Sequence, residues 1–186
     1  MPLNNFKVAA LATNGFEQAE FTQPRNALVA AGATVHLISP QAGTIKAWDG
    51  DDWGKDFGVD RQLAGTDPAE YDALLLPGGV LNPDELRLHP AALRFVEHFC
   101  QADKPVGVIC HGSQTMISAG LVSNRIMTGY RAIQIDLRNA GASVVTDEPV
   151  VVDQNLVSSR NPDDLPDFCA QLVHVCTRYR APHPTA

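Results

Sequence analysis

The chain has 186 residues, of which 45% are hydrophobic and 19% are charged, and this composition is typical of a globular domain rather than of a disordered chain. Fourteen basic residues against twenty-one acidic ones leave a formal net charge of −7, which disfavours binding to nucleic acid or to an anionic membrane surface. No stretch of the sequence has the apolar length of a membrane span, and the N-terminal residues lack the pattern of a signal peptide, so the sequence predicts a cytoplasmic protein.

The first forty residues predict a strand, a helix and a second strand. Residues 7–12 are a short apolar run bounded by a turn signal. Apolar residues then recur at helical spacing over 17–31, but Pro24 moves the expected start of the regular helix to about Thr22, because proline is tolerated in the first turn. A glycine ends this helix, and residues 34–39 read as the second strand.

Residues 41–63 differ from the segments on either side. They hold four glycines and an acidic cluster, and they predict a solvated loop with short hairpin strands. The cluster does not have the pattern of a calcium loop, because Trp53 stands where a third oxygen ligand would be expected. An insert of this kind can also cover an oligomer interface.

Strands and helices alternate again in the rest of the chain. Strands are predicted at 73–76, 106–109 and 143–146, helices at 90–101, 113–119 and 133–139, a hairpin over 150–158, and a last helix from 161 to about 178. Repeated strand–helix units with nearly continuous apolar strands predict an α/β fold, whose mostly parallel sheet is covered on both faces. We expect a single domain over 1–186, with a core over about 6–178 and a frayed tail over 179–186.

The cysteines and histidines do not form the patterns of a disulfide scaffold or a metal site. All four cysteines lie in apolar-periodic segments, and neither CxxC, HxH nor HExxH occurs. The sequence therefore predicts no metal and no cofactor. Three of the four cysteines, Cys100, Cys169 and Cys176, are expected to be inert core residues.

Cys110 is different because of its position. It follows the apolar strand 106–109 and precedes His111, Gly112 and a helix, so a nucleophile there would sit on a sharp strand-to-helix turn near the positive end of the helix. Both features favour the thiolate. The alternative is a buried, unreactive cysteine.

Other candidates follow the ends of neighbouring predicted strands, where ligands bind in doubly wound sheets. Glu17 and Glu20 can project from one side of a first helical turn, although acids at a helix start also simply complement its dipole. The Gly79 amide can form one half of an oxyanion hole and an amide near His111 the other half, or the glycines can be a plain turn. Adjacent residues rarely point at the same atom, so His111 need not accept the Cys110 proton.

Together, six segments resemble the ThiJ/PfpI family of the class I glutamine-amidotransferase-like superfamily. They are N-G-F-E-Q-A-E (14–20), L-P-G-G (76–79), P-D-E-L-R (83–87), I-C-H-G (109–112), N-A-G-A (139–142) and V-V-V-D…S-S-R-N-P-D-D-L (150–165). The resemblance covers about residues 6–175. The sequence departs from the family pattern at Ser113, where proline is frequent, and at Tyr130, which stands in G-Y-R where S-Y-P is frequent.

The resemblance implies a flavodoxin-like three-layer sandwich with a cysteine nucleophile elbow. It implies that Cys110 is the nucleophile, that Glu20 contacts it with Glu17 nearby, and that Gly79 and His111 supply oxyanion amides. An acid after a proline, here Asp84, reaches the histidine of a neighbouring subunit in the protease-like members. The resemblance therefore also implies a homodimer or a larger even-numbered assembly.

The function implied by the resemblance is that of a cysteine-dependent stress-response hydrolase that attacks carbonyl carbons. The substrate would be a small carbonyl compound or a peptide or protein. One possibility is an intracellular peptidase or amidase, and another is a deglycase or glyoxalase acting on methylglyoxal and its protein adducts. The alternative is a non-enzymatic oxidative-stress sensor or chaperone-like protein, switched by oxidation of Cys110.

Overall fold

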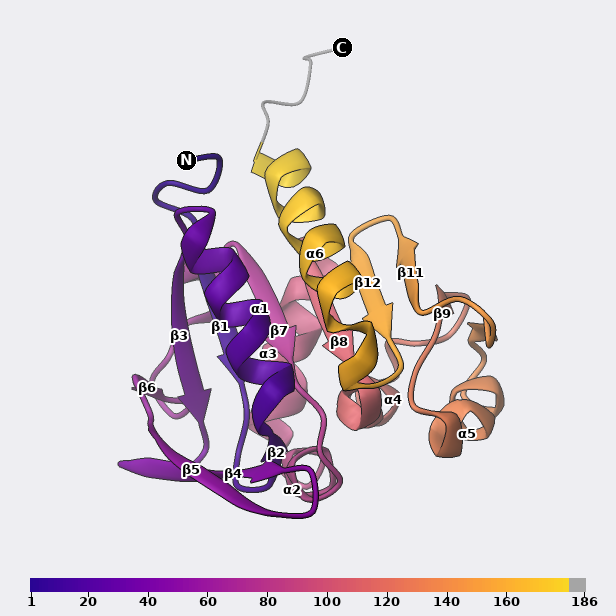
Figure 1. The fold of residues 1–186 in the computed structure, drawn as a ribbon, viewed down its shortest axis with the longest axis horizontal. Coiled ribbons are helices and arrows are strands. Elements are labelled where there is room, and N and C mark those ends of the chain that lie inside the picture. The colour runs from indigo at the N-terminus through magenta and orange to yellow at the C-terminus, as the bar shows by residue number, and fades with distance from the viewer. Residues whose placement is uncertain (181–186) are drawn as a thin grey trace.

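A seven-stranded sheet forms the centre of the computed structural model, which describes residues 1–180 (Figure 1). Its strand order is β11-β12-β8-β7-β1-β3-β6, and every neighbouring pair is parallel except β11 with β12. The strands are β1 (Lys7–Leu11), β3 (Thr34–Ser39), β6 (Arg61–Gln62), β7 (Ala73–Leu76), β8 (Val106–Ile109), β11 (Val150–Asp153) and β12 (Leu156–Ser159). The predicted α/β fold with a mostly parallel sheet is confirmed.

Helices cover both faces of this sheet. On one face lie α1 (Gln18–Ala30) and α6 (Leu165–Arg180), which pass in front of the strands in Figure 1. Helices α2 (Leu81–Leu86), α3 (Pro90–Gln101), α4 (Ser113–Ser118) and α5 (Gln134–Asn139) contribute to the hydrophobic cluster on the other face. The sheet is consequently buried on both sides, which explains why its central strands are apolar at every position.

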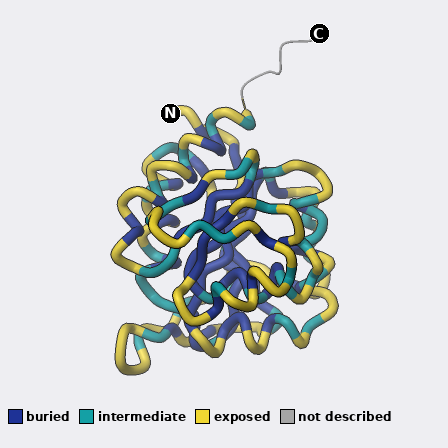
Figure 2. The backbone as a smooth tube through the Cα atoms, turned by 90° about the vertical axis from the view of Figure 1, so that its right-hand side faces the viewer, coloured by how far each residue is buried: buried dark blue, intermediate teal, exposed yellow. Residues whose placement is uncertain are grey.

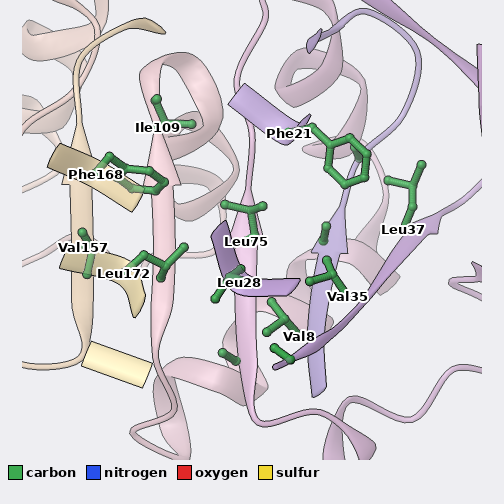
Figure 3. Packing of buried hydrophobic residues seen from close by; sticks show 14 of the residues in the cluster. Val8, Phe21, Leu28, Val35, Leu37, Leu75, Ile109, Val157, Phe168 and Leu172 are labelled. Atoms are coloured by element: carbon green, nitrogen blue, oxygen red, sulfur yellow. The ribbon is translucent and has the colours of Figure 1, made fainter. Parts of the chain in front are cut away.

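On the face covered by α1 and α6, side chains of both helices pack against the sheet in one hydrophobic cluster (Figure 3). Leu28 of α1 and Leu172 of α6 are both fully buried, and a buried leucine contributes roughly 1.5–3 kcal/mol. Gly107 of β8 allows α6 to approach closely, because a Cβ atom there would lie 2.9 Å from Leu172 Cδ1 and 3.1 Å from Phe168 Cζ. Figure 2 shows buried segments of the backbone at the centre and more exposed segments around them.

The start of α1 corrects the prediction from sequence. The helix begins at Gln18, not at about Thr22, and it contains Pro24 in its interior. Pro24 has no N–H to donate to the carbonyl of Glu20, which costs helix stability. The earlier start places Glu20 and Phe21 in buried positions, and the packing of this turn against the sheet outweighs the lost hydrogen bond.

The segment 41–63 forms the predicted hairpin. Strand β4 (Thr44–Asp49) pairs antiparallel with β5 (Asp52–Gly58), and β2 (Phe16–Glu17) pairs parallel with β4. The ring of Phe57 packs edge-on against Phe16 and Phe21, at centroid distances of 5.4 and 5.5 Å. The hairpin is therefore tied to the segment that follows β1, at the end of the sheet where the candidate site residues lie.

The remaining elements are short. A two-stranded sheet joins β9 (Ile126–Met127) to β10 (Ser143–Val144), and the 3-10 turns are η1 (Pro68–Glu70), η2 (Cys110–Gly112), η3 (Arg131–Ile133) and η4 (Pro162–Asp164). Helix α6 continues to Arg180, beyond the predicted end at about Arg178. The rest of the predicted tail, 181–186, lies outside the described residues. None of the helices within 1–180 combines the length and the apolar character that a membrane crossing requires.

Candidate active site

Cys110 occupies a strained turn between β8 and α4. Its φ of +59° is a conformation that residues other than glycine rarely adopt, and it starts the single turn η2 that leads into α4. Gly112 lets this turn lie against the end of β7, since a Cβ atom there would be 2.6 Å from the Leu76 carbonyl oxygen. The structure thus contains the predicted strand-to-helix elbow.

The elbow opens onto a cavity of about 420 Å³. Residues from the ends of several elements line it: Gly15, Glu17, Glu20, Trp48, Gly50, Gly79, Val80, Leu81, Cys110, His111, Tyr130 and Pro162. Cys110 is only 7% exposed. The cavity contains five of the six candidate site residues, brought together from three separate segments of the chain.

Glu20 lies beside Cys110 without exposure to solvent. Its Oε2 atom accepts a 2.7 Å hydrogen bond from the Gly78 amide. Burial raises the pKa of Glu20 to about 8, although the Gly78 amide and the Cys110 thiol oppose the rise. No hydrogen bond of ordinary geometry reaches Oε1 from residues 1–180. Glu20 is therefore largely protonated at neutral pH, and one oxygen can still take part in another hydrogen bond.

The thiol of Cys110 does not follow the expectation of a favoured thiolate. Burial and the neighbouring Glu20 carboxyl raise the pKa of Cys110, whereas the backbone amides of His111 and Gly79 lower it. The rise prevails because the sulfur is enclosed and shares its surroundings with a second acid. The predicted hydrogen-bond donors, the amides of His111 and Gly79, are present, but they lower the pKa of Cys110 by less than burial raises it.

His111 contacts the sulfur despite being the next residue in the chain. Its Nδ1 atom lies 3.2 Å from Cys110 Sγ, and the ring of Tyr130 stacks on the imidazole at a centroid distance of 4.5 Å. Burial lowers the pKa of His111, which keeps the ring neutral and able to accept a proton. Adjacent side chains rarely point at the same atom, but His111 and Cys110 are an exception, in a turn where Cys110 has a positive φ.

The other two predicted acids differ in position. Glu17 lines the cavity, and burial raises its pKa despite a hydrogen bond with the Gly50 backbone. Asp84 lies on α2, exposed and outside the cavity lining. Within one chain the structure therefore does not bring Asp84 to His111.

Asn82 is a structural residue that the sequence analysis missed. It is fully buried, its Oδ1 accepts from the Thr13 amide at 2.8 Å, and its Nδ2 donates to the carbonyls of Pro77 and Gly78 at 2.9 and 3.1 Å. These bonds join the ends of β1 and β7 under the site. In the sequence, the only indication of this role is that Asn82 closely follows the Gly78-Gly79 turn. That its side chain is buried is visible only in the folded structure.

Two aromatic residues complete the cavity. Trp48 reaches it from the hairpin, and its indole Nε1–H donates to the Gly50 carbonyl. Tyr130 also lines the cavity, with its ring stacked on that of His111. Among residues 1–180, no cluster of three or more histidine, cysteine or acidic side chains has the arrangement of a metal site.

The chain also matches known proteins over most of its length. The model of the DJ-1/PfpI family matches residues 6–175. The chain belongs to the DJ-1/PfpI family. It is 44% identical over 170 residues to "Protein/nucleic acid deglycase 2" of Escherichia coli strain K12, covering 91% of this chain and 96% of that protein. It is 40% identical over 163 residues to "General stress protein 18" of Bacillus subtilis strain 168, covering 87% and 92%.

Solved structures of the family share the fold. A two-domain protein from Anabaena variabilis, with DJ-1/ThiJ/PfpI-like and ferritin-like domains, matches with a TM-score of 0.84 and 34% identity over 91% of this chain. This chain covers 47% of that larger one. DJ-1beta of Drosophila melanogaster matches with a TM-score of 0.83 and 21% identity, covering 94% of this chain and 95% of its own.

Proposed function

We propose that the protein is a cysteine-dependent hydrolase of the DJ-1/PfpI family that attacks carbonyl carbons. The observation that carries the proposal is the 3.2 Å contact between Cys110 Sγ and the neutral His111 imidazole inside a cavity. A thiol with a proton acceptor at hydrogen-bonding distance is the arrangement that nucleophilic catalysis uses. The printed names of the two relatives, a deglycase and a general stress protein, support a deglycase role in a stress response.

In the proposed reaction Cys110 forms a bond to the carbonyl carbon of the substrate. Because burial keeps the thiol protonated, its proton must leave as the bond forms, and His111 Nδ1, 3.2 Å from the sulfur, can accept it. The backbone amides of His111 and Gly79 are close enough to the sulfur to lower its pKa, so they can donate to the developing oxyanion. Because Glu20 is protonated, it carries no negative charge that would repel the developing oxyanion.

The cavity favours small substrates for this chemistry. A volume of about 420 Å³ can hold a dicarbonyl such as methylglyoxal or one modified side chain, within the usual range of ligand pockets. Cleavage of a peptide amide uses the same first step but needs room for chain on both sides of the reacting carbonyl. We therefore place the deglycase or glyoxalase reaction before the peptidase or amidase reaction.

A turnover assay tests the proposal. We expect wild-type protein to consume methylglyoxal and the Cys110→Ser variant to have at most about a hundredth of that rate, while Cys100→Ser keeps it. A peptide amide tested in parallel distinguishes the two hydrolase reactions. Equal consumption by wild type and Cys110→Ser would contradict the nucleophile assignment.

A redox sensor is the second candidate, and the Oε1 atom of Glu20 favours it. This oxygen lies buried next to the thiol without a hydrogen bond of ordinary geometry from residues 1–180. A protonated carboxyl there can donate to an oxygen of a Cys110 sulfinate. Mass spectrometry after mild peroxide treatment tests this role: we expect sulfinate at Cys110 in wild type, and much less in Glu20→Leu.

Assembly and location remain parts of the proposal. We propose a cytoplasmic homodimer or larger even-numbered assembly in which Asp84, exposed on α2, approaches His111 of a neighbouring subunit. Two-fold self-association is the commonest route to such an assembly. Apart from other copies of the chain, we expect its partners to be substrates only. The net charge of −7 disfavours a stable complex with nucleic acid or with a membrane.

A further inference from the structure

A second cavity adjoins the catalytic one. It has a volume of about 500 Å³ and is lined by Tyr130, Arg131, Gln134, Thr146, Arg160 and Asn161, which we call the anion cavity. Tyr130 lines both cavities, and Pro162 of the catalytic cavity is the second residue after Arg160. The two cavities therefore share the Tyr130 side chain as part of their walls.

The lining of the anion cavity is rich in hydrogen-bond donors. Each of its six side chains carries an N–H or O–H group, and no carboxylate is among them. Asn161 Oδ1 accepts from the Asp163 amide, so its amide nitrogen is left to donate elsewhere. Such a surface complements a ligand that only accepts hydrogen bonds.

The two arginines have different roles. Arg160 forms a bidentate pair with Asp164, at 3.0 and 2.9 Å, and is held in a fixed position by it. Arg131 is exposed and makes neither an ion pair nor a side-chain hydrogen bond with residues 1–180. Since Asp164 neutralises Arg160 and Glu148 also acts on it, the uncompensated positive charge of the cavity comes from Arg131.

We propose that the anion cavity is a subsite for a phosphate or carboxylate group of the substrate whose carbonyl reacts at Cys110. This inference rests on the proposed function for the reacting end of the substrate, but the subsite itself does not depend on turnover. A guanidinium binds either oxyanion through two parallel hydrogen bonds. The enzyme would then prefer anionic carbonyl adducts over neutral ones, with Arg131 as a specificity-determining residue.

Binding is tested first in the Cys110→Ser background, where no chemistry can interfere. Inorganic phosphate and acetate are titrated separately at constant ionic strength, and backbone amide resonances are followed by nuclear magnetic resonance. We expect saturable shifts at Arg131 and Asn161, at least fivefold weaker binding in Arg131→Gln, and binding within twofold of the parent in Arg138→Gln. Arg138 is an exposed arginine on α5 outside both cavities.

The ion that binds more tightly identifies the group as phosphate or carboxylate. Arg131 is chosen over Arg160 because removal of Arg160 would leave buried Asp164 without its partner. Absence of saturable shifts for both ions, or equal binding by the parent and Arg131→Gln, would overturn the subsite.

A second measurement tests the link to Cys110. Two methanethiosulfonates of similar length, one with a sulfonate tail and one with a trimethylammonium tail, react with the thiolate to form a mixed disulfide and release methanesulfinate. The rate ratio of anionic to cationic reagent at Cys110, determined by peptide mapping, should fall about fivefold in Arg131→Gln and stay within twofold in Arg138→Gln.

The two measurements separate the possible failures. Phosphate or acetate binding with an unchanged rate ratio would show that the anion site is not on the substrate path, which overturns the proposed link. If Cys110 reacts with neither reagent, the proposed nucleophile fails, and the binding titration alone decides the subsite.

Discussion

The Nδ1 atom of His111 lies 3.2 Å from Sγ of Cys110, although the two residues are neighbours in the chain. The left-handed conformation of Cys110, with φ of +59°, makes this contact possible, and the stacked ring of Tyr130 holds the imidazole in place. Backbone strain of this kind costs of order 1–3 kcal/mol. Its result is a thiol and a base that share one hydrogen bond inside a cavity.

The contact predicts that His111 accepts the thiol proton. His111→Asn replaces the ring nitrogen by a polar group that cannot take up a proton at neutral pH. We expect turnover to fall roughly 100-fold, since general base catalysis contributes at least that much, while the unfolding midpoint changes little. His89→Asn, on the exposed His89–Glu85 pair, is the control. A rate loss equal in both variants would contradict the assignment.

Glu20 predicts a pH dependence of stability. Its pKa is about 8 in the folded protein against an ordinary value of 4.5, so the folded state retains a proton that the unfolded state releases. The stabilising contribution is complete below pH 4.5 and is lost as the pH rises toward 8, by about 1.4 kcal/mol per pH unit at most. Glu20→Gln has no proton to lose. Urea denaturation from pH 5 to 8 should show wild type losing stability relative to Glu20→Gln, and parallel curves would contradict the buried, protonated state.

Glu20 also predicts the reactivity of Cys110 above neutral pH. Ionisation of Glu20 places a negative charge beside the sulfur and raises the pKa of Cys110 further. In Glu20→Gln this repulsion is absent, so the apparent pKa from iodoacetamide rates should be lower than in wild type. The cysteines Cys100, Cys169 and Cys176 serve as internal references, because their pKa values of about 11, 11 and 12 arise from burial. An unchanged apparent pKa at Cys110 would show that the two groups are not coupled.

Gly78 predicts a steric limit at the site. A Cβ atom there would lie 2.6 Å from Glu20 Oε2 and 2.8 Å from Cys110 Cβ, so Gly78→Ala must displace the carboxyl or the elbow. We expect turnover to fall at least tenfold, with a stability loss of about 1–3 kcal/mol. Gly58→Ala, which meets no atom within 4 Å and has no positive φ, should change neither property. Full turnover of Gly78→Ala would mean that the packing around the carboxyl can relax freely.

The buried hydrogen bonds of Asn82 predict that its replacement lowers the stability of the fold. None of these hydrogen bonds involves Cys110, so we expect the reaction at Cys110 to be retained. Asn82→Leu removes one acceptor and two donor contacts and leaves the buried Thr13 amide unpaired. Each unsatisfied buried group costs about 1–3 kcal/mol, so the free energy of unfolding should fall by roughly 3 kcal/mol. Asn155→Leu, at a half-buried amide that donates to the Lys104 carbonyl, provides a matched comparison. A loss below 1 kcal/mol would indicate that the hydrogen bonds of Asn82 are not needed to hold the ends of β1 and β7 together.

Several elements were predictable from the sequence with their observed bounds. Strands 34–39, 73–76 and 106–109 and helix 90–101 coincide with β3, β7, β8 and α3. Their apolar periodicity and their bounding glycines and prolines are local signals. The position of Cys110 between a buried strand and a helix was visible for the same reason, and so was the α/β class.

Only the tertiary structure decided the electrostatics and the support of the site. Glu20 and Cys110 are far apart in sequence, yet burial next to each other raises both pKa values. The stacking of Tyr130 on His111 and the brace formed by Asn82 likewise join residues from different elements. A sequence shows which groups are present and where its elements begin and end, but desolvation and contact depend on which segments meet when the chain packs, and that is a property of the whole fold.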